Sequence, residues 1–241
     1  MAINAPVLDM LKQVTGQIPA PRRMLCLGYP DMLVTPAQIE KTCGAEVLAQ
    51  TQWRDDSESI LRWHNLGGAM DRVAESRSLF SAMGIETDFV DIVASRGFEI
   101  VLDLNEPAPA DLLGKYDIVY DGGTMEHCFN VAQVMMNILD FAKVGGFIIH
   151  VNPINYYNHG FFNFNPTFYH DWYGQAGNQV VSPFYAMHGP VLQSRLVVLE
   201  AVKSFVAPER SVMMLAARKA SPARPKWPTQ TKYLRNSELR G

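Results

Sequence analysis

The pattern of apolar and polar positions changes period repeatedly along the chain, from the spacing of strands to that of helices. Short apolar runs that suit buried strands occur at residues 24–27, 87–93, 98–105, 116–121 and 147–153. Between and before them, apolar residues recur every three or four positions, over residues 7–14, 70–83 and 131–142. This alternation predicts an α/β fold with a mostly parallel sheet.

Local signals mark where some of these helices begin and end. Thr35 followed by Pro36 predicts a helix start, and Gln38 can complete a capping box. Gly145-Gly146 is expected to end the helix that precedes the fifth strand.

The last third of the chain carries weaker patterns. A helix is expected from Asn165-Pro166 to residue 172 or 173, and residue 211 begins a last strand. Residues 179–186 predict a sixth strand in which Pro183 favours an edge or a bulge. Residues 195–202 are ambiguous between helix and strand. Residues 220–241, with three prolines and a single glutamate, are expected to form an extended, solvated tail.

Composition narrows the classes of protein to consider. The chain has 241 residues, 48% of them hydrophobic, which suits one medium globular domain. A net charge of -3 gives no reason to expect a nucleic-acid or membrane partner. No apolar run approaches the ~18 residues that a membrane span needs, and no secretory signal is visible. The three cysteines form no CxxC pair, which favours a reduced, cytoplasmic setting.

Several well-known catalytic motifs are absent from the sequence. The histidines show no HxxxH or HxH spacing, so no metal site is expected. There is no phosphate-binding Gly-x-x-x-x-Gly-Lys-Ser/Thr loop and no Gly-x-Ser-x-Gly turn. Without Gly-x-Gly-x-x-Gly, a nucleotide-sugar or dinucleotide enzyme of Rossmann type is a weak alternative.

Polar side chains gather where the predicted strands end, which is where open α/β sheets bind ligands. Asp91 follows the second strand, and a carboxylate there can accept hydrogen bonds from both hydroxyls of a ribose. Asp103 follows the third strand and can bond an amino group of adenine. Gly122 and Gly123 follow the fourth strand and allow the backbone to approach a ligand closely.

This arrangement resembles the class I S-adenosylmethionine-dependent methyltransferases over roughly residues 22–218. The resemblance is carried by "DFVDIV", "VLDLNEPAP", "YDIVYDGGTMEHCFNV", "VGGFIIHVNP" and "NHGFFNFNP". It implies a Rossmann-like, mostly parallel seven-stranded sheet flanked by helices, and S-adenosylmethionine as cofactor. The residues that it implies for cofactor binding are Gly28, Asp31, Asp91, Asp103, Leu104, Gly122, Gly123, Thr124 and Glu126.

The sequence departs from this family after the first strand. The family has an acidic residue and a Gly-x-Gly-x-Gly turn there, where this chain has Cys26 and "GYPD". Pro30 has no N–H to donate, and Asp31 is the candidate to replace the missing acid by reaching the cofactor's ammonium group. The spacing from Gly28 to Asp91 also exceeds the ~20 residues found in related folds, so residues 35–70 are expected to be a helical insertion, acting as a lid or substrate wall. Residues 1–219 are then a single domain.

The segment "NYYNHGFFNFNPTFYH" follows the fifth strand and is rich in aromatic and amide side chains. It is expected to hold the methyl acceptor, although an aromatic-packed cap is the alternative. His159 is the first candidate for a catalytic base and His127 the second. In the insertion, Trp53, Arg54, Trp63 and His64 are substrate candidates, with ordinary packing an equal alternative. The residues expected to bind substrate after the fifth strand are Tyr157, Asn158, Phe161 and Asn163.

Two functions therefore remain open from the sequence. The first is a methyltransferase acting on a small-molecule or glycan-like acceptor. The second is a methyltransferase-like fold that has lost catalysis and serves as a binding or scaffold protein, as the altered "LCLGYPD" suggests.

Overall fold

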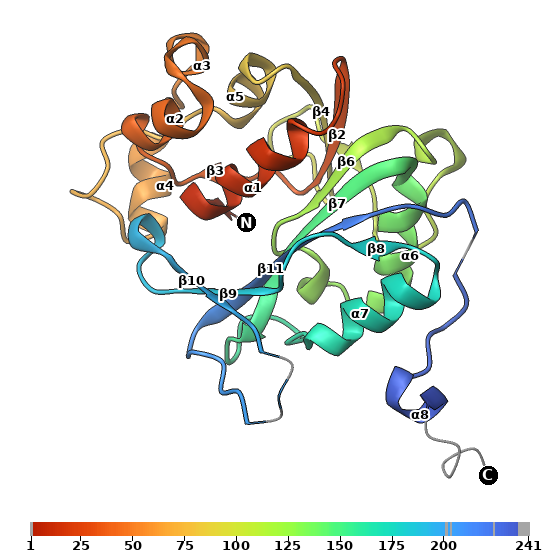
Figure 1. Ribbon diagram of the computed structural model, residues 1–241. Helices are drawn as coiled ribbons and strands as arrows, with labels where there is room; N and C mark the ends of the chain where they lie inside the picture. Colours follow the sequence, from red (N-terminus) through yellow and green to blue (C-terminus); the bar gives the residue numbers. More distant parts are fainter. Residues whose placement is uncertain (1, 201, 203, 224, 236–241) are drawn as a thin grey trace.

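The computed structural model describes residues 2–235 except 201, 203 and 224. Its centre is a nine-stranded sheet (Figure 1), which confirms the α/β prediction and adds strands to the seven expected. From one edge to the other, the strands are β10 (Arg195–Val198), β9 (Tyr185–His188), β11 (Ser211–Arg218), β7 (Ala142–Asn155), β6 (Tyr116–Asp121), β2 (Arg22–Leu27), β4 (Ile85–Asp91) and β5 (Ile100–Val101), while β8 (Gln179–Val180) pairs with β11.

Five neighbouring strands of this sheet, from β5 to β7, run parallel. β11 is antiparallel to β7 and separates it from β9. The expected sixth strand is divided into β8 and β9, because the chain turns between them at Ser182-Pro183, where proline cannot donate to a ladder. Of the ambiguous residues 195–202, the first four form β10 at the sheet edge, and residue 201 lies outside the described part.

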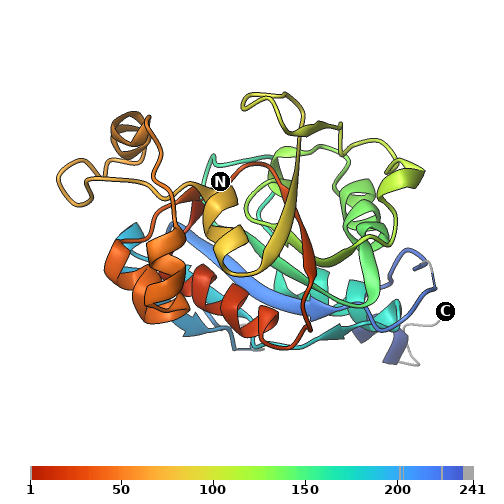
Figure 2. The same ribbon diagram turned by 90° about the horizontal axis from the view of Figure 1, so that it is seen from above.

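Helices cover both faces of the sheet, so the molecule has three layers (Figures 1 and 2). Successive strand residues face opposite layers, as the alternation of side chains in strands requires. In β2, Met24 and Cys26 belong to one core with α1 (Ala5–Thr15), α2 (Pro36–Cys43) and α5 (Ser76–Ala82). Leu25 and Leu27 belong to the other core, with α6 (Val131–Phe141) and α7 (Pro166–Gln175).

Most predicted helix starts are confirmed. Thr35 and Gln38 form the expected capping box at α2, and Asn165 accepts a hydrogen bond from Thr167 N at the start of α7. The expected end of α6 at Gly145-Gly146 is wrong, because the helix ends at Phe141. The last carbonyls of α6 are occupied instead: Lys219 Nζ donates to Leu139 O and Ala142 O.

The helical insertion after β2 is also confirmed. It contains α2, α3 (Ala45–Gln50) and α4 (Ser57–Trp63). A short parallel pair, β1 (Ala2–Ile3) with β3 (Asp31–Met32), joins the N-terminal segment to the residues that enter the insertion. The helix expected over residues 70–83 begins only at Ser76, because Glu75 caps it and Ala74 bridges to Met32 and Trp53.

The described C-terminal residues from 222 onward are mostly exposed, and they carry no helix or strand up to residue 230, but they contact the rest of the fold. This segment returns to α7, where Thr229 exchanges hydrogen bonds with Gln175 and Trp227 lies 6.3 Å from Trp172 between ring centroids. It then forms α8 (Thr231–Arg235), where Thr231 bonds the side chain of Asp171. Residues 236–241 lie outside the described part. Among the described residues, no helix is long and apolar enough to cross a membrane.

Candidate functional site

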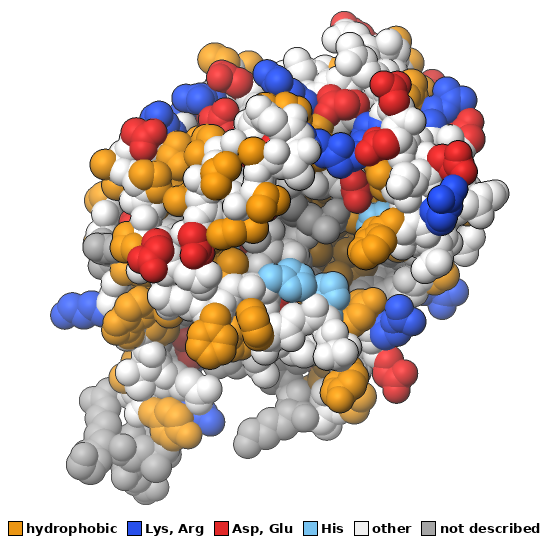
Figure 3. All heavy atoms as spheres, turned by 180° about the vertical axis from the view of Figure 1, so that it is seen from behind, with side chains coloured by type: hydrophobic (Ala, Val, Ile, Leu, Met, Phe, Trp, Pro, Cys, Tyr) orange, Lys and Arg blue, Asp and Glu red, His pale blue; other side chains and the backbone are white. Residues whose placement is uncertain are grey.

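Two cavities open beside the carboxyl ends of the parallel strands, and they share Gly123 and His127. The strand-end cavity has a volume of about 430 Å³ and is lined by Gly28, Tyr29, Val90, Asp91, Ile92, Leu102, Asp103, Leu104, Asn105, Gly123, Thr124, His127 and Cys128. The outer cavity, of about 710 Å³, is lined by Gly122, Gly123, Glu126, His127, Val151, Tyr156, His159, three segments near residues 2–4, 64–66 and 187–194, and residues 209, 210 and 212. Figure 3 shows a hollow on this face with histidine side chains beside it.

The turn after β6, residues 121–127, forms the wall that the two cavities share, and hydrogen bonds to a buried carboxylate hold it in place. Asp121, fully buried, accepts hydrogen bonds at Oδ1 from Thr124 N and Met125 N, both at 3.2 Å. Gly123 has a φ of 96°, which favours glycine. A Cβ at Gly122 would come within 2.5 Å of the Tyr120 ring, so packing also requires that glycine.

The turns after β2 and β6 are bonded to each other. Thr124 Oγ1 donates to Leu27 O at 2.5 Å, and Gly28 N donates to Val90 O at 2.6 Å. Three neighbouring strand ends are thereby joined at the floor of the strand-end cavity.

Two buried carboxylates lie behind the shared wall and are bridged by one amide. Asn152 Nδ2 donates to Asp121 Oδ2 at 2.9 Å and to Glu126 Oε2 at 3.0 Å. Tyr169 fixes the orientation of this amide by donating its hydroxyl to Asn152 Oδ1 at 2.7 Å. Asp121, Glu126 and Asn152 are 0–1% exposed, so these bonds satisfy polar groups that water does not reach.

A second chain of polar groups reaches Asp121 from α7. His150 Nδ1 lies 3.0 Å from Asp121 Oδ2, and its Nε2 lies 2.6 Å from the Tyr173 hydroxyl. Burial, followed by the charge of Asp121, raises the pKa of Tyr173 well above its usual value. The hydroxyl therefore stays protonated, and it lies within hydrogen-bond distance of His150 Nε2.

Glu126 connects this buried network to the outer cavity. Its Oε1 lies 3.5 Å from His159 Nε2, and the rings of His159 and His127 are 5.3 Å apart. Tyr156 packs on His159 with ring centroids 4.5 Å apart. Ligand atoms of Glu126, His127 and His159 all lie within 4.8 Å of one another, a grouping that no local sequence spacing shows.

The structure brings most predicted cofactor residues to these cavities. Asp91 and Asp103 line the strand-end cavity, where Asp103 Oδ1 also accepts from Asn105 N at 2.9 Å. Of the predicted set, Gly28, Asp91, Asp103, Leu104, Gly123 and Thr124 line the strand-end cavity, and Gly122, Gly123 and Glu126 line the outer one.

Asp31 is not brought to either cavity wall. Its two carboxylate oxygens lie 2.9 Å from Arg54 Nη1 and 3.0 Å from His64 Nε2. Tyr29, which follows Gly28, packs on Phe89 and Phe98, with ring centroids 4.5 and 5.4 Å away. Of the insertion residues predicted to contact substrate, His64 lines the outer cavity, whereas Trp53, Arg54 and Trp63 do not.

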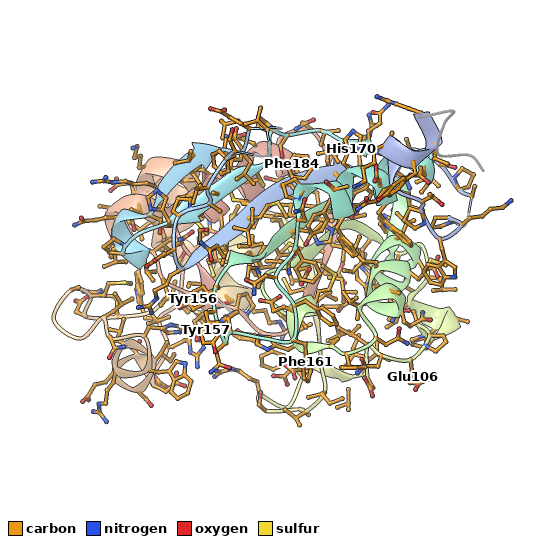
Figure 4. All side chains as sticks on the ribbon, turned by 90° about the horizontal axis from the view of Figure 1, so that it is seen from below. Glu106, Tyr156, Tyr157, Phe161, His170 and Phe184 are labelled. Atoms are coloured by element: carbon orange, nitrogen blue, oxygen red, sulfur yellow. The ribbon has the colours of Figure 1, made fainter. Side chains whose placement is uncertain are left out.

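The four predicted substrate residues lie outside both cavity linings. Tyr157 is 95% exposed and Phe161 65% exposed, and Figure 4 shows both on the segment after β7. Asn158 is exposed, with a left-handed φ of 56°. Asn163 acts within the segment, since its Oδ1 accepts from Tyr156 N at 2.8 Å. Tyr156 and His159 are the members of this segment that line the outer cavity.

Other residues of the site were given no role from the sequence. Asn152 lies in an apolar run that is typical of any buried strand. Its carboxylate partners, Glu126 and Asp121, are 26 and 31 residues away in the chain. Asn4, His188 and Arg210 reach the outer cavity from segments far apart in the chain. The tertiary fold brings these residues together, for example through the hydrogen bond from Asn4 to Ser194.

Comparison with known proteins places this geometry in a structural context. Neither a protein-family model nor a curated protein sequence matches the chain. Solved structures do match: CurJ carbon methyltransferase, at 12% identity and a TM-score of 0.50, covers 91% of this chain and 54% of its own. The citrinin polyketide synthase CMeT domain (11%, TM-score 0.47) covers 91% and 52%, and a SAM-dependent methyltransferase from Archaeoglobus fulgidus (12%, 0.46) covers 89% and 93%. Two 16S rRNA methyltransferases also match. The chain thus spans about half the length of the first two structures, and it has the fold of the class I S-adenosylmethionine-dependent methyltransferases.

Proposed function

We propose that this chain is an S-adenosylmethionine-dependent methyltransferase that acts on a small-molecule or glycan-like acceptor. The observation that carries the proposal is the junction of the two cavities at Gly123 and His127. A methyl group carried in one cavity would meet an acceptor in the other at this wall. Positioning of this kind can supply much of the rate of a displacement reaction.

The residues of the strand-end cavity fit the cofactor. Its volume of about 430 Å³ suits a drug-sized ligand. Asp91 would accept hydrogen bonds from the ribose hydroxyls, and Leu104 and Asp103 would hold the adenine. Gly28 and Gly123 leave the backbone accessible at the methionine end. When bound, the cofactor supplies an electrophilic methyl group on a sulfonium.

The outer cavity supports a compact acceptor. Its volume is about 710 Å³, and the insertion, the N-terminal segment and the end of β9 all contribute to its walls. Its lining mixes imidazole, amide and aromatic groups with aliphatic ones, which suits a polar metabolite or sugar. The net charge of -3 offers no broad attraction for a polynucleotide.

His159 is the side chain we propose for removing a proton from the acceptor. Glu126 lies beside its Nε2, which favours the tautomer that leaves the Nδ1 lone pair available. An acceptor O–H or N–H would transfer its proton to Nδ1 while the acceptor lone pair forms the bond to the methyl carbon. The carbon–sulfur bond breaks in the same step, and its electron pair stays on sulfur.

Calorimetric titration with S-adenosylhomocysteine tests the cofactor assignment. The wild-type chain should bind, and Asp91→Ala should weaken binding about 10- to 100-fold, because hydrogen bonds to a charged group contribute about 1.5–3 kcal/mol. Asp111→Ala is the matched control, since this exposed acid lines neither cavity. Failure of the wild type to bind at high micromolar ligand would support the inactive scaffold instead.

The acceptor class has its own test. The wild-type chain is incubated with methyl-labelled cofactor and either a protein-free metabolite extract or total RNA. Label should enter the metabolite fraction, and His159→Asn should reduce its incorporation while leaving S-adenosylhomocysteine affinity unchanged. Incorporation into RNA alone would overturn the proposed acceptor class.

A further inference from the structure

We infer that Glu126, His127 and His159 bind a divalent transition-metal cation at the junction of the two cavities. Its role in acceptor activation rests on the proposed function, whereas the binding of the cation does not. The site would deepen that function by supplying a Lewis acid beside the acceptor.

The distances between the donor atoms suit a common coordination sphere. One carboxylate oxygen and two imidazole nitrogens lie within 4.8 Å of one another, and Glu126 Oε1 is 3.5 Å from His159 Nε2. Metal bonds of about 2.0–2.2 Å in a tetrahedral site separate neighbouring ligand atoms by about 3.3–3.6 Å. His127 is exposed, so its side chain has room to rotate and shorten the longer separations.

Two buried acidic side chains lie behind this junction. Asp121 and Glu126 are both buried, and the amide that bridges them is neutral. In the described part of the chain, the ion-pair partners of these two acids are histidines, His150 and His159, with no lysine or arginine. Buried carboxylates are stable when they are paired or coordinate a metal, and a cation on Glu126 would supply that pairing.

The carboxylate ligand is already held in place. Asn152 binds Glu126 Oε2, and Tyr169 fixes Asn152, so Oε1 is the oxygen left towards the cavity. A Cβ at Gly123 would lie 3.2 Å from Oε1, so the glycine leaves space beside this oxygen. Outer-sphere hydrogen bonds of this kind orient metal ligands and raise affinity.

Two imidazoles and one carboxylate indicate which cations the site would take. This set suits zinc, manganese, iron(II) or cobalt, whereas magnesium and calcium prefer oxygen ligands. Three protein ligands leave coordination positions open, and all three residues line the outer cavity. A hydroxyl bound there would have a lower pKa, so the cation would replace His159 as the group that favours loss of the acceptor's proton.

The test titrates cobalt(II) alone into the full, chelator-treated chain, with visible absorption and calorimetry as readouts. One saturable site should appear, and His159→Asn should weaken it by at least about 100-fold. Glu126→Gln should do the same. His170→Asn is the matched control, because this exposed histidine on α7 should leave affinity unchanged.

Two outcomes would overturn the inference: no saturable site in the wild type, or equal affinity in the His159→Asn variant. His159 is 36% exposed on its side chain, so this variant should fold even if the buried Glu126→Gln does not. Binding of S-adenosylhomocysteine by the metal-free chain is measured separately. Cobalt binding without cofactor binding would refute the proposed function alone, and the reverse result would refute the metal site alone.

Discussion

The turns after β6 and β2 lie side by side at the strand-end cavity, yet they are stabilised in different ways. Residues 121–127 are held by buried hydrogen bonds from Asn152, which itself is fixed by α7. Residues 28–31 are held by aromatic contacts of Tyr29 and by the ion pair between Asp31 and Arg54 of the insertion. One wall is therefore part of the core, and the other depends on the insertion.

This difference determines what a mutation in each wall would disturb. In the wall after β6, a substitution would leave buried polar groups without partners, because the carboxylates there have no access to water. In the wall after β2, the insertion supports the backbone through Arg54, and Thr124 joins this wall to the turn after β6 by its hydrogen bond to Leu27 O. The two walls should thus respond to mutation with different magnitudes and different readouts.

Asn152→Leu should have the largest effect, because it leaves two buried carboxylates without their shared donor. We expect unfolding to become easier by about 3 kcal/mol or more, since unsatisfied buried charged groups cost more than neutral ones. Denaturant titration measures this change. Asn155→Ala, at the exposed end of the same strand, is the control and should cost much less. Equal losses in both variants would contradict the buried bridge.

Arg54→Met should have the next largest effect and tests the wall after β2. Arg54 is 7% exposed and bonds both Asp31 and Asp56, so we expect a loss of about 2 kcal/mol. Its hydrogen bond lowers the pKa of Asp56 below 3.8. The ion pair of Asp56 with Arg54 therefore stabilises the folded state above the usual pKa of an aspartate, and this stabilisation is lost as the pH falls through the lowered pKa of Asp56. The variant's stability should therefore fall less steeply in acid, and parallel acid denaturation curves would contradict this.

Gly123→Ala should have a smaller effect on stability and a specific one on binding. Its φ of 96° makes a side chain unfavourable by about 1–2 kcal/mol. Gly114→Ala is matched, because its φ of 62° is also left-handed and no atom lies within 4 Å of the added Cβ. Both should lower the melting temperature, but only Gly123→Ala should weaken S-adenosylhomocysteine binding. Weaker S-adenosylhomocysteine binding in both variants would contradict a specific role of Gly123 at the cofactor cavity.

Alkylation of Cys128 is the mildest test, because it measures the reactivity of one thiol and leaves the stability of the fold unchanged. Burial, and then the carboxylates of Asp121, Asp103 and Glu126, raise the pKa of this thiol to about 11. At pH 8 its alkylation should be about 100-fold slower than in the urea-unfolded chain, because the thiolate reacts. The rate should rise with pH up to the raised pKa. Peptide mass spectrometry measures this, and equal rates in both states would contradict the shift.

The alternating strands and helices were predicted well from the sequence, because the signals that mark them are local. The α/β order and the capping box at Thr35 follow from spacing within a few residues, whereas the helical insertion was predicted from the long span between Gly28 and Asp91. The end of α6 was predicted wrongly, because its carbonyls are satisfied by Lys219, almost 80 residues away. The exposure of the tail is what its composition predicts, whereas the contact of Trp227 with Trp172 on α7 has no signal in the composition.

The site was less predictable than the fold. Acids at strand ends could be predicted, since each follows its own strand directly. The bridge between Asp121 and Glu126 could not, because Asn152 lies on another strand and its neighbours carry no marking pattern. The aromatic segment after the fifth strand was singled out as a whole, but the structure distinguishes its members: Tyr156 lines the outer cavity, whereas Tyr157 is 95% exposed.

The position of β11 has a consequence for synthesis of the chain on the ribosome. This strand lies between β7 and β9, so β9 and β10 cannot join the sheet until residues 211–218 have emerged. Roughly 60 residues separate the end of β7 from that point, which corresponds to about 3–12 s of translation at 5–20 residues per second. During this interval the nascent chain presents an unpaired apolar strand edge, so early termination before β11 should yield an aggregating product rather than a smaller folded one.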